Sequence, residues 1–221
     1  MATARATSQR IPHGRNHEQV ASEIRQLIMG GLLGPGQPVN QDEIAERLGV
    51  SRMPVREALR TLAVEGLVQF HPNRGAVVTE LSRRDMEELY ALRIMLEGPA
   101  ARRSAENMTS EHLTGLQGLI KEMERLRDGP RAEWAEVHYR FHLSLYEAAG
   151  MPRLGRLIAA LRNLVEPYSR IYIRLPERMR QAEREHRDLV AACRKRDGER
   201  AEKVLIEHLS SPSRALLDLL P

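Results

Sequence analysis

Residues 42–67 read DEIAERLGVSRMPVREALRTLAVEGL and hold two short amphipathic patterns of helical spacing, separated by Gly49. A tight turn between two helices needs a residue that adopts a positive φ, and glycine does so without strain. Ser51 stands where its side chain can cap the second helix. One face of that helix is apolar, at Val55, Ala58, Leu59 and Leu62. The stretch therefore predicts a helix-turn-helix.

Arginines recur every four residues along one flank of the second predicted helix. Arginines in the first turns of a helix can hydrogen-bond guanine edges in the major groove of DNA. Residues 67–79 predict a β-hairpin, a wing whose tip can reach phosphates or the minor groove. Three arginines alone are typical of a solvated surface, but the joint pattern predicts DNA binding. We assign DNA contacts to Ser51, Arg52, Arg56, Arg60, Asn73 and Arg74.

Composition narrows the class of protein. Of 221 residues, 42% are hydrophobic, 29% charged and 4% aromatic, which favours a mainly helical fold over a β-sandwich. The single cysteine, Cys193, excludes a disulfide framework and a cysteine-only zinc ribbon. No apolar run reaches the ~18 residues of a membrane span, and residues 1–15 lack a signal sequence, so we expect a cytoplasmic protein without membrane contact. The net charge of +4 is small, so DNA binding rests on placed arginines.

Three segments are expected along the chain. Residues 1–15 are polar and basic and predict a flexible arm. Residues 16–81 form the predicted winged helix-turn-helix domain. From 82 to 221 the pattern changes to long amphipathic helices without strands, separated by glycine and proline breakers. This second segment predicts an antiparallel all-α bundle of about six helices.

Four of the eight histidines occupy related positions in the predicted bundle. His138 and His142 are four residues apart, so both project from one side of a helix. His186 and His208 lie within the apolar stripes of the last two helices, about equally far from the turn at 197–198. At a rise of ~1.5 Å per residue, their imidazoles are expected at nearly the same height.

These four histidines predict a site for a divalent transition metal. A single histidine in an apolar stripe is more often a hydrogen-bonded core residue, but four at matched height are a costly arrangement unless something binds them. An all-nitrogen donor set suits Zn²⁺, Ni²⁺ or Cu²⁺ better than Mn²⁺, with zinc favoured and nickel next. It also leaves the charge of the metal uncompensated, which predicts an anionic ligand, most simply a carboxylate.

Parts of both segments resemble a known family. Residues 49–68, GVSRMPVREALRTLAVEGLV, and 72–78, PNRGAVV, resemble the winged helix-turn-helix of GntR-type bacterial transcription regulators. Residues 88–105, ELYALRIMLEGPAARRSA, and 141–150, FHLSLYEAAG, resemble the FCD ligand-binding domain of their FadR-type subfamily. The resemblance implies base contacts by two of the arginines assigned above, Arg52 and Arg56.

The resemblance also shows two departures. Some members of the family carry an arginine early in the helix that precedes the recognition helix. Asp42 or a neighbouring residue stands at that position here, so we do not assign the contact of that arginine to this chain. Many FCD domains hold a metal through an aspartate four residues before the histidine of an "FH" motif, together with two later histidines. His142, His186 and His208 match the three histidines, whereas His138 stands at the aspartate position.

Arg93 and Glu97 are four residues apart and allow two interpretations. They can form an ion pair along one helix, which contributes ~0.3–0.5 kcal/mol. Alternatively, as the resemblance implies, Arg93 faces an effector pocket and holds a carboxylate bidentately. We assign Asn163, Tyr168 and Tyr172 to the same pocket. The resemblance implies effectors among small acids from sugar, aromatic or fatty-acid catabolism.

The favoured function is a ligand-responsive transcription regulator, acting as a repressor and not as an enzyme. A homodimer would place two recognition helices in successive major grooves, so the operator is expected to be a short palindrome. One alternative is a metal-dependent hydrolase, since a histidine-bound metal can generate hydroxide, but the DNA-binding segment has no role in it. The other alternative is a regulator in which the metal itself is the signal.

Overall fold

The computed structural model describes the backbone of residues 15–172 and 176–217, and the side chains of 15–170 and 177–217. Most of the arm predicted at 1–15 therefore lies outside the described residues. The chain divides into two compact units, with the boundary between Thr79 and Glu80. The boundary expected from the sequence lies two residues later, after Leu81, which the structure places in the core of the second unit.

The first unit is a winged helix-turn-helix, as the sequence predicts. It contains three helices, a two-stranded antiparallel hairpin in which Val68 pairs with Val78, and a bridge from Pro38 to Val77. Its elements are α1 (His17–Met29), α2 (Gln41–Leu48), α3 (Arg52–Val64), β1 (Val68–His71) and β2 (Gly75–Val78). The hairpin follows α3 directly and forms the wing.

The turn between α2 and α3 depends on Gly49. This residue adopts φ 65° and ψ 39°, and its N–H closes the end of α2 on carbonyl oxygens of Ala45 and Glu46. Ser51 does occupy the position before α3, with extended backbone, but its side chain makes no capping hydrogen bond. The predicted cap is therefore wrong at Ser51, which leaves the hydroxyl group at the surface, since this residue is exposed.

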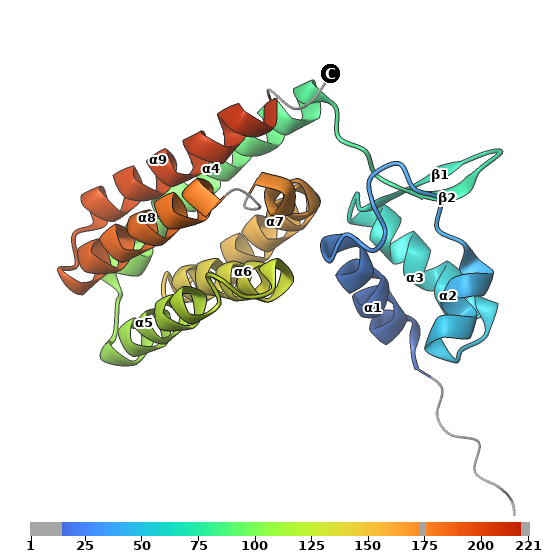
Figure 1. The fold of residues 1–221 in the computed structure, drawn as a ribbon, viewed down its shortest axis with the longest axis horizontal. Helices are drawn as coiled ribbons and strands as arrows, with labels where there is room; N and C mark the ends of the chain where they lie inside the picture. The colour runs from blue at the N-terminus through green and yellow to red at the C-terminus, as the bar shows by residue number, and fades with distance from the viewer. Residues whose placement is uncertain (1–14, 173–175, 218–221) are drawn as a thin grey trace, which may run out of the picture. The chain divides into compact units, whose positions relative to one another are not determined.

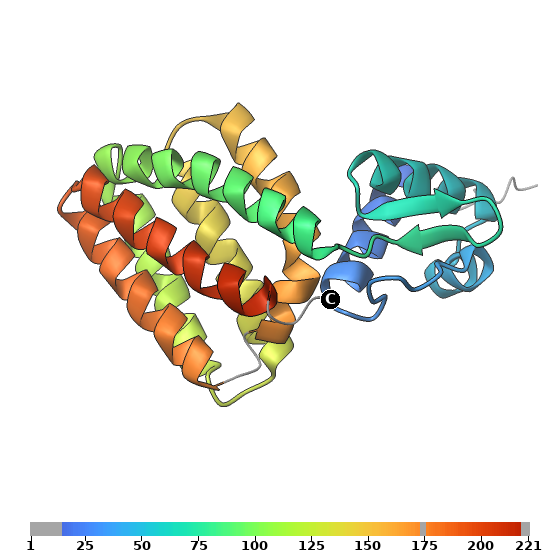
Figure 2. The same ribbon diagram turned by 90° about the horizontal axis from the view of Figure 1, so that it is seen from above.

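The second unit contains six described helices, the number expected from the sequence (Figures 1 and 2). Helix α4 packs along α9 and also against α7, while α5 packs against α6 and α8. Helices α8 and α9 are joined by a short turn and form a helical hairpin. The elements are α4 (Arg83–Glu106), α5 (Ser110–Arg125), α6 (Arg131–Glu147), α7 (Pro152–Tyr172), α8 (Pro176–Arg194) and α9 (Gly198–Leu217).

Local sequence signals fix where these helices begin and how closely they approach. Ser82 and Asp85 form a reciprocal capping box at the start of α4. At the start of α9, a Cβ added to Gly198 would lie 2.8 Å from Cγ of Arg102, so only glycine permits this contact with α4. The backbone N–H of Leu81 donates a 2.7 Å hydrogen bond to the Tyr168 hydroxyl, which ties the entry of α4 to α7.

No described helix combines the length and apolar composition needed to cross a bilayer. The core of the second unit is instead built from aromatic and aliphatic side chains of several helices, which are fully or almost fully buried. Its largest fully buried members include Tyr90, Leu116, Met123, Trp134, Phe141, Leu145 and Ile158.

Replacing Gly49 by alanine tests the turn of the first unit. Gly49→Ala is expected to destabilise α2 and α3 by about 1–2 kcal/mol, because an L-residue is strained at this positive φ although there is room for its Cβ. As a control, Gly115→Ala in the exposed middle of α5 is expected to stabilise that helix by about 0.5–1 kcal/mol. Hydrogen exchange of the amides in each helix measures both effects. Unchanged protection of the α2 and α3 amides in Gly49→Ala would contradict the requirement for glycine in this turn.

Candidate functional site

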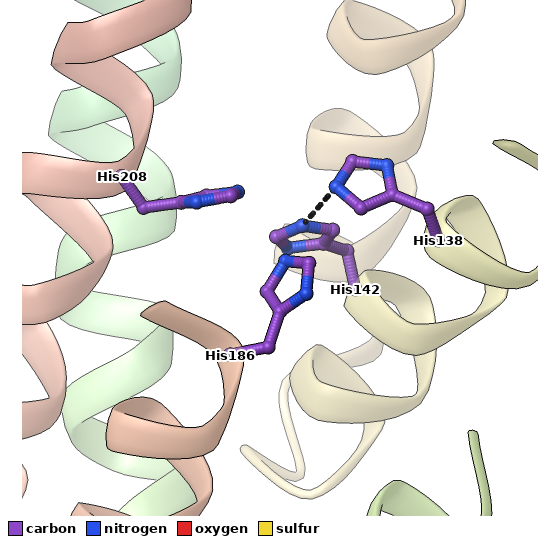
Figure 3. Close-up of side chains that lie close together, drawn as sticks. All are labelled: His138, His142, His186 and His208. Carbon is purple, nitrogen blue, oxygen red and sulfur yellow. Dashed lines mark hydrogen bonds between the residues drawn. The ribbon is translucent and has the colours of Figure 1, made fainter. Parts of the chain in front are cut away.

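The four histidines singled out in the sequence lie together inside the second unit. Helix α6 supplies His138 and His142, α8 supplies His186 and α9 supplies His208, and Figure 3 shows their rings directed toward one another. One ring nitrogen from each residue lies within 4.8 Å of those from the others. The ring centroids of His186 and His208 are 4.8 Å apart, so the helical hairpin does place them level.

The ring nitrogens of this histidine cluster have few partners. His142 and His186 are fully buried, and neither nitrogen of His186 nor Nδ1 of His142 has a hydrogen bond among the described residues. Burial lowers the pKa of both imidazoles well below the usual value, with a further contribution from Arg162 at His142 and from His208 at His186. Both rings are therefore neutral and keep lone pairs that can bind a metal.

His208 is held in position by a carboxylate. Its Nδ1 lies 2.7 Å from Oε2 of Glu185, which leaves Nε2 for the histidine cluster. Burial alone would raise the pKa of Glu185, but the hydrogen bond with His208 holds it below its usual value. A carboxylate behind a histidine is the usual way in which a metal-binding imidazole is oriented and made more basic.

The spacing of the donor atoms suits a small metal ion in part. Nε2 of His138 and Nε2 of His142 are 3.2 Å apart, close to the ~3.3 Å between neighbouring ligands in a tetrahedral site with bonds of about 2.0–2.1 Å. Separations of up to 4.8 Å elsewhere in the histidine cluster are wider than this. Together with the unpaired nitrogens, the donor set fits a divalent metal whose binding draws the rings together.

A cavity adjoins the histidine cluster and is bounded by charged residues. His138, His142 and His208 form one part of its wall, and Arg93, Arg162 and Glu166 contribute to the rest. The space open to the centres of water molecules is about 40 Å³. Cationic groups in the wall of a cavity favour an anionic occupant.

The ion pair between Arg93 and Glu97 is present in the structure, and Arg93 also lies at the cavity. Its Nε lies 2.6 Å from Oε1 of the fully buried Glu97, and the same arginine borders the cavity. Burial alone would raise the pKa of Glu97, but Arg93 and Arg162 hold it below its usual value. The small contribution to stability expected from the sequence for an ion pair between Arg93 and Glu97 holds for exposed pairs. It does not apply here, because both partners are buried and removing one would leave an unpaired charge.

The remaining residues assigned to the effector pocket are placed differently. Asn163 accepts a 2.7 Å hydrogen bond from the Tyr139 hydroxyl, and Tyr168 is bonded to Leu81; neither is among the residues that line the cavity. We therefore leave these two out of the effector site. The side chain of Tyr172 lies outside the described residues.

Sequence reasoning missed Arg162 and Glu166, which face the cavity from α7. A signal for them was present in the sequence. Both fall in register with Ile158 and Val165, which are fully buried, so two charges interrupt an apolar stripe. Buried charges of this kind are rare without a partner or a function.

The residues assigned to DNA lie on the surface of the first unit. The side chains of Arg52, Arg56 and Arg60 on α3 are 74%, 51% and 61% exposed. Arg52 pairs with Asp42, and Arg60 pairs with Glu57 at 3.0 Å. Exposed ion pairs of this kind are weak, so the guanidinium groups remain available to a stronger partner.

The tip of the wing also carries its assigned residues at the surface. Asn73 and Arg74 are both exposed. Arg74 donates a 3.3 Å hydrogen bond to the carbonyl oxygen of Gly36. The side chains on α3 and on the wing thus form two exposed polar surfaces within one unit.

Comparison with known families accounts for both units. A model described as bacterial regulatory proteins of the gntR family matches residues 16–78, and a model of the FCD domain matches 88–211. The chain belongs to the GntR family. It is a DNA-binding transcription regulator of the branch that carries an FCD domain.

Relatives of this GntR regulator span almost the whole chain. The "HTH-type transcriptional repressor RspR" of Escherichia coli is 29% identical, with 90% of this chain and 88% of the relative covered. A protein of Paenarthrobacter nicotinovorans named "Probable D-xylose utilization operon transcriptional repressor" is 33% identical, with coverage of 93% and 91%. The solved structure of E. coli McbR/YncC superposes with a TM-score of 0.83 at 27% identity, covering 92% of this chain and 97% of that one.

Replacing His186 by leucine tests whether the histidine cluster binds a metal or is only a part of the packed core. Without metal, His186→Leu is expected to leave the melting temperature unchanged or raise it, because leucine buries no unpaired nitrogen. Zinc is expected to raise the melting temperature of the wild-type protein but not that of the variant. His112→Leu is the control, since His112 has a buried unpartnered ring nitrogen outside the histidine cluster. Equal stabilisation of His186→Leu and wild type by zinc would refute the site.

Proposed function

We propose that this GntR regulator is a repressor whose DNA binding is controlled by a small organic acid bound at a histidine-ligated metal. The observation that carries the proposal is the histidine cluster itself. The buried imidazoles of His142 and His186 keep unpaired nitrogens, and the histidine cluster borders a cavity with arginines in its wall. A metal would use the nitrogens, and an acid would neutralise the charge that remains.

His138, His142, His186 and His208 would hold the metal. A metal bound there supplies positive charge at which a carboxylate can coordinate. Four nitrogen donors favour zinc first and nickel second over manganese, which prefers oxygen ligands. We propose binding rather than catalysis, because the carboxylate in contact with the histidine cluster, Glu185, is hydrogen-bonded to His208.

The DNA-binding surface acts through α3 and the wing. We propose that Arg52 and Arg56 contact base edges, while Ser51, Arg60, Asn73 and Arg74 contact the backbone or the minor groove. As a homodimer the protein would bind a short palindromic operator, one recognition helix in each half-site. The names of two relatives support repression as the direction of control.

Control requires that the acid bind one arrangement of the DNA-binding units better than another. A ligand with equal affinity for both arrangements changes nothing. Titration of operator binding against zinc, with and without small carboxylic acids, tests this proposal. If zinc alone sets the affinity for DNA and no acid alters it, the protein is a metal sensor and the effector proposal is wrong.

Arg56→Ala tests base reading by α3. The variant is expected to lose about 1–3 kcal/mol of binding free energy for an operator selected from random duplexes, since one bidentate base contact disappears. Binding to a scrambled duplex is expected to change far less. Fluorescence anisotropy at fixed salt measures both affinities. Arg103→Ala, an exposed arginine of α4, is the control, and an equal effect of both substitutions would remove Arg56 from base readout.

His138→Asp tests the identity of the metal ligands. The carboxylate introduces an oxygen donor at the position where the family pattern has aspartate, so the preference for zinc over manganese is expected to fall at least tenfold. Elemental analysis after dialysis against both metals measures the preference. About one zinc per wild-type chain is expected. An unchanged metal ratio in His138→Asp would show that residue 138 is not a ligand.

A further inference from the structure

The folded part of the first unit has little net attraction for DNA. Residues 16–79 hold six arginines and seven aspartates or glutamates, a net charge of −1. Three of these carboxylates, those of Asp42, Glu43 and Glu46, are exposed on α2, the helix that precedes α3. The affinity of a protein for DNA depends strongly on cationic groups that neutralise phosphates. The exposed arginines of α3 therefore act against a background of negative charge.

The arm predicted at residues 1–15 has the opposite composition. It holds three arginines, Arg5, Arg10 and Arg15, and no aspartate or glutamate. Adding these residues changes the net charge from −1 to +2. The surplus positive charge of the first unit thus belongs to a segment without an assigned role.

The structure fixes the point at which this segment joins the folded unit. Nη1 of Arg15 donates a 3.2 Å hydrogen bond to the carbonyl oxygen of Leu48, the last residue of α2. Asn16 and Gln19 hold the start of α1 by two reciprocal hydrogen bonds of 3.0 and 2.8 Å between backbone and side chain. Since Gly49 follows Leu48 directly, Arg15 lies beside the turn that leads into α3.

The position of Arg15 limits what the residues before it can reach. Helix α3 starts at Arg52, and the first turns of a recognition helix face the major groove. Five residues of chain span at most about 18 Å, so Arg10 stays within that distance of Arg15, and Arg5 within about 36 Å. One turn of B-DNA is about 34 Å long. Both arginines can therefore reach phosphates within about one helical turn of the bases read by α3.

We propose that residues 1–14 are a further DNA-binding segment, in which Arg5 and Arg10 bind phosphates of the DNA that flanks the bases read by α3. The proposal rests on the DNA-binding function of the chain and adds a contact to those of α3 and the wing. Phosphate contacts position a protein on the duplex but carry no sequence information. The segment therefore raises the affinity for every duplex, whereas the base contacts of α3 distinguish one sequence from another.

Substitution of both arginines tests the proposal. The double variant Arg5→Gln/Arg10→Gln is expected to bind the selected operator and a scrambled duplex at least tenfold more weakly, with the ratio of the two affinities changed less than threefold. Each lost phosphate contact lowers the steepness of log affinity against log salt by about 0.9, so a fall of about 2 per bound chain is expected. Fluorescence anisotropy of the full-length protein over a salt series measures both quantities.

The matched control removes the same charge from the second unit. Arg194→Gln/Arg200→Gln replaces two exposed arginines of α8 and α9 and is expected to change either affinity less than twofold. If Arg5→Gln/Arg10→Gln shows the affinities and salt dependence of this control, residues 1–14 do not contact DNA and the proposal is wrong. Failure of the wild-type protein to bind any duplex would instead overturn the DNA-binding function, and this proposal with it.

Shortening the duplex locates the contact. Removal of the base pairs outside those read by α3 is expected to weaken wild-type binding at least tenfold, because the phosphates bound by Arg5 and Arg10 are lost. The same removal is expected to weaken binding of Arg5→Gln/Arg10→Gln less than threefold. An equal loss for both proteins would place the two arginines away from the flanking DNA and overturn the assignment.

Discussion

Burial of unpaired imidazole nitrogens is the constraint on which the helical unit depends. His142 and His186 are fully buried and neutral, and three of their four ring nitrogens lack a hydrogen bond among the described residues. Such a centre is stabilised only by an external ion or by very close packing around it. The α8–α9 hairpin meets the geometric requirement, since it places His186 and His208 at one level beside the histidine pair of α6.

Most of the fold could be predicted from the sequence because its signals are local. Gly49 marks the interhelical turn by its need for a positive φ, the wing strands follow their β-type runs, and breakers separate the six helices of the bundle. Ser51 is the exception among the caps. A serine in the right position predicts a helix start, but whether its hydroxyl bonds to the backbone depends on a rotamer that spacing does not determine.

The histidine cluster and the cavity differed in how well the sequence predicted them. Histidine positions on helices convert directly into height and face, so the histidine cluster followed from counting residues. The cavity wall depends on which helix packs against which. Tyr168 and Asn163 were assigned to it although nothing in their spacing indicates a cavity, and their polar atoms bond to Leu81 and Tyr139. Arg162 and Glu166 line it because α7 carries two charges in its buried stripe.

The hydrogen bond from Leu81 to Tyr168 has a mechanical consequence. Tyr168 lies two residues beyond Glu166 on α7, and Leu81 is the second residue after the winged unit ends at Thr79. A rotation or axial shift of α7 would therefore be transmitted through this hydrogen bond to the start of the connecting chain. Since Tyr90 and Arg93 of α4 also line the cavity, its wall reaches the connecting chain by two routes, one covalent through the start of α4 and one through this hydrogen bond from α7.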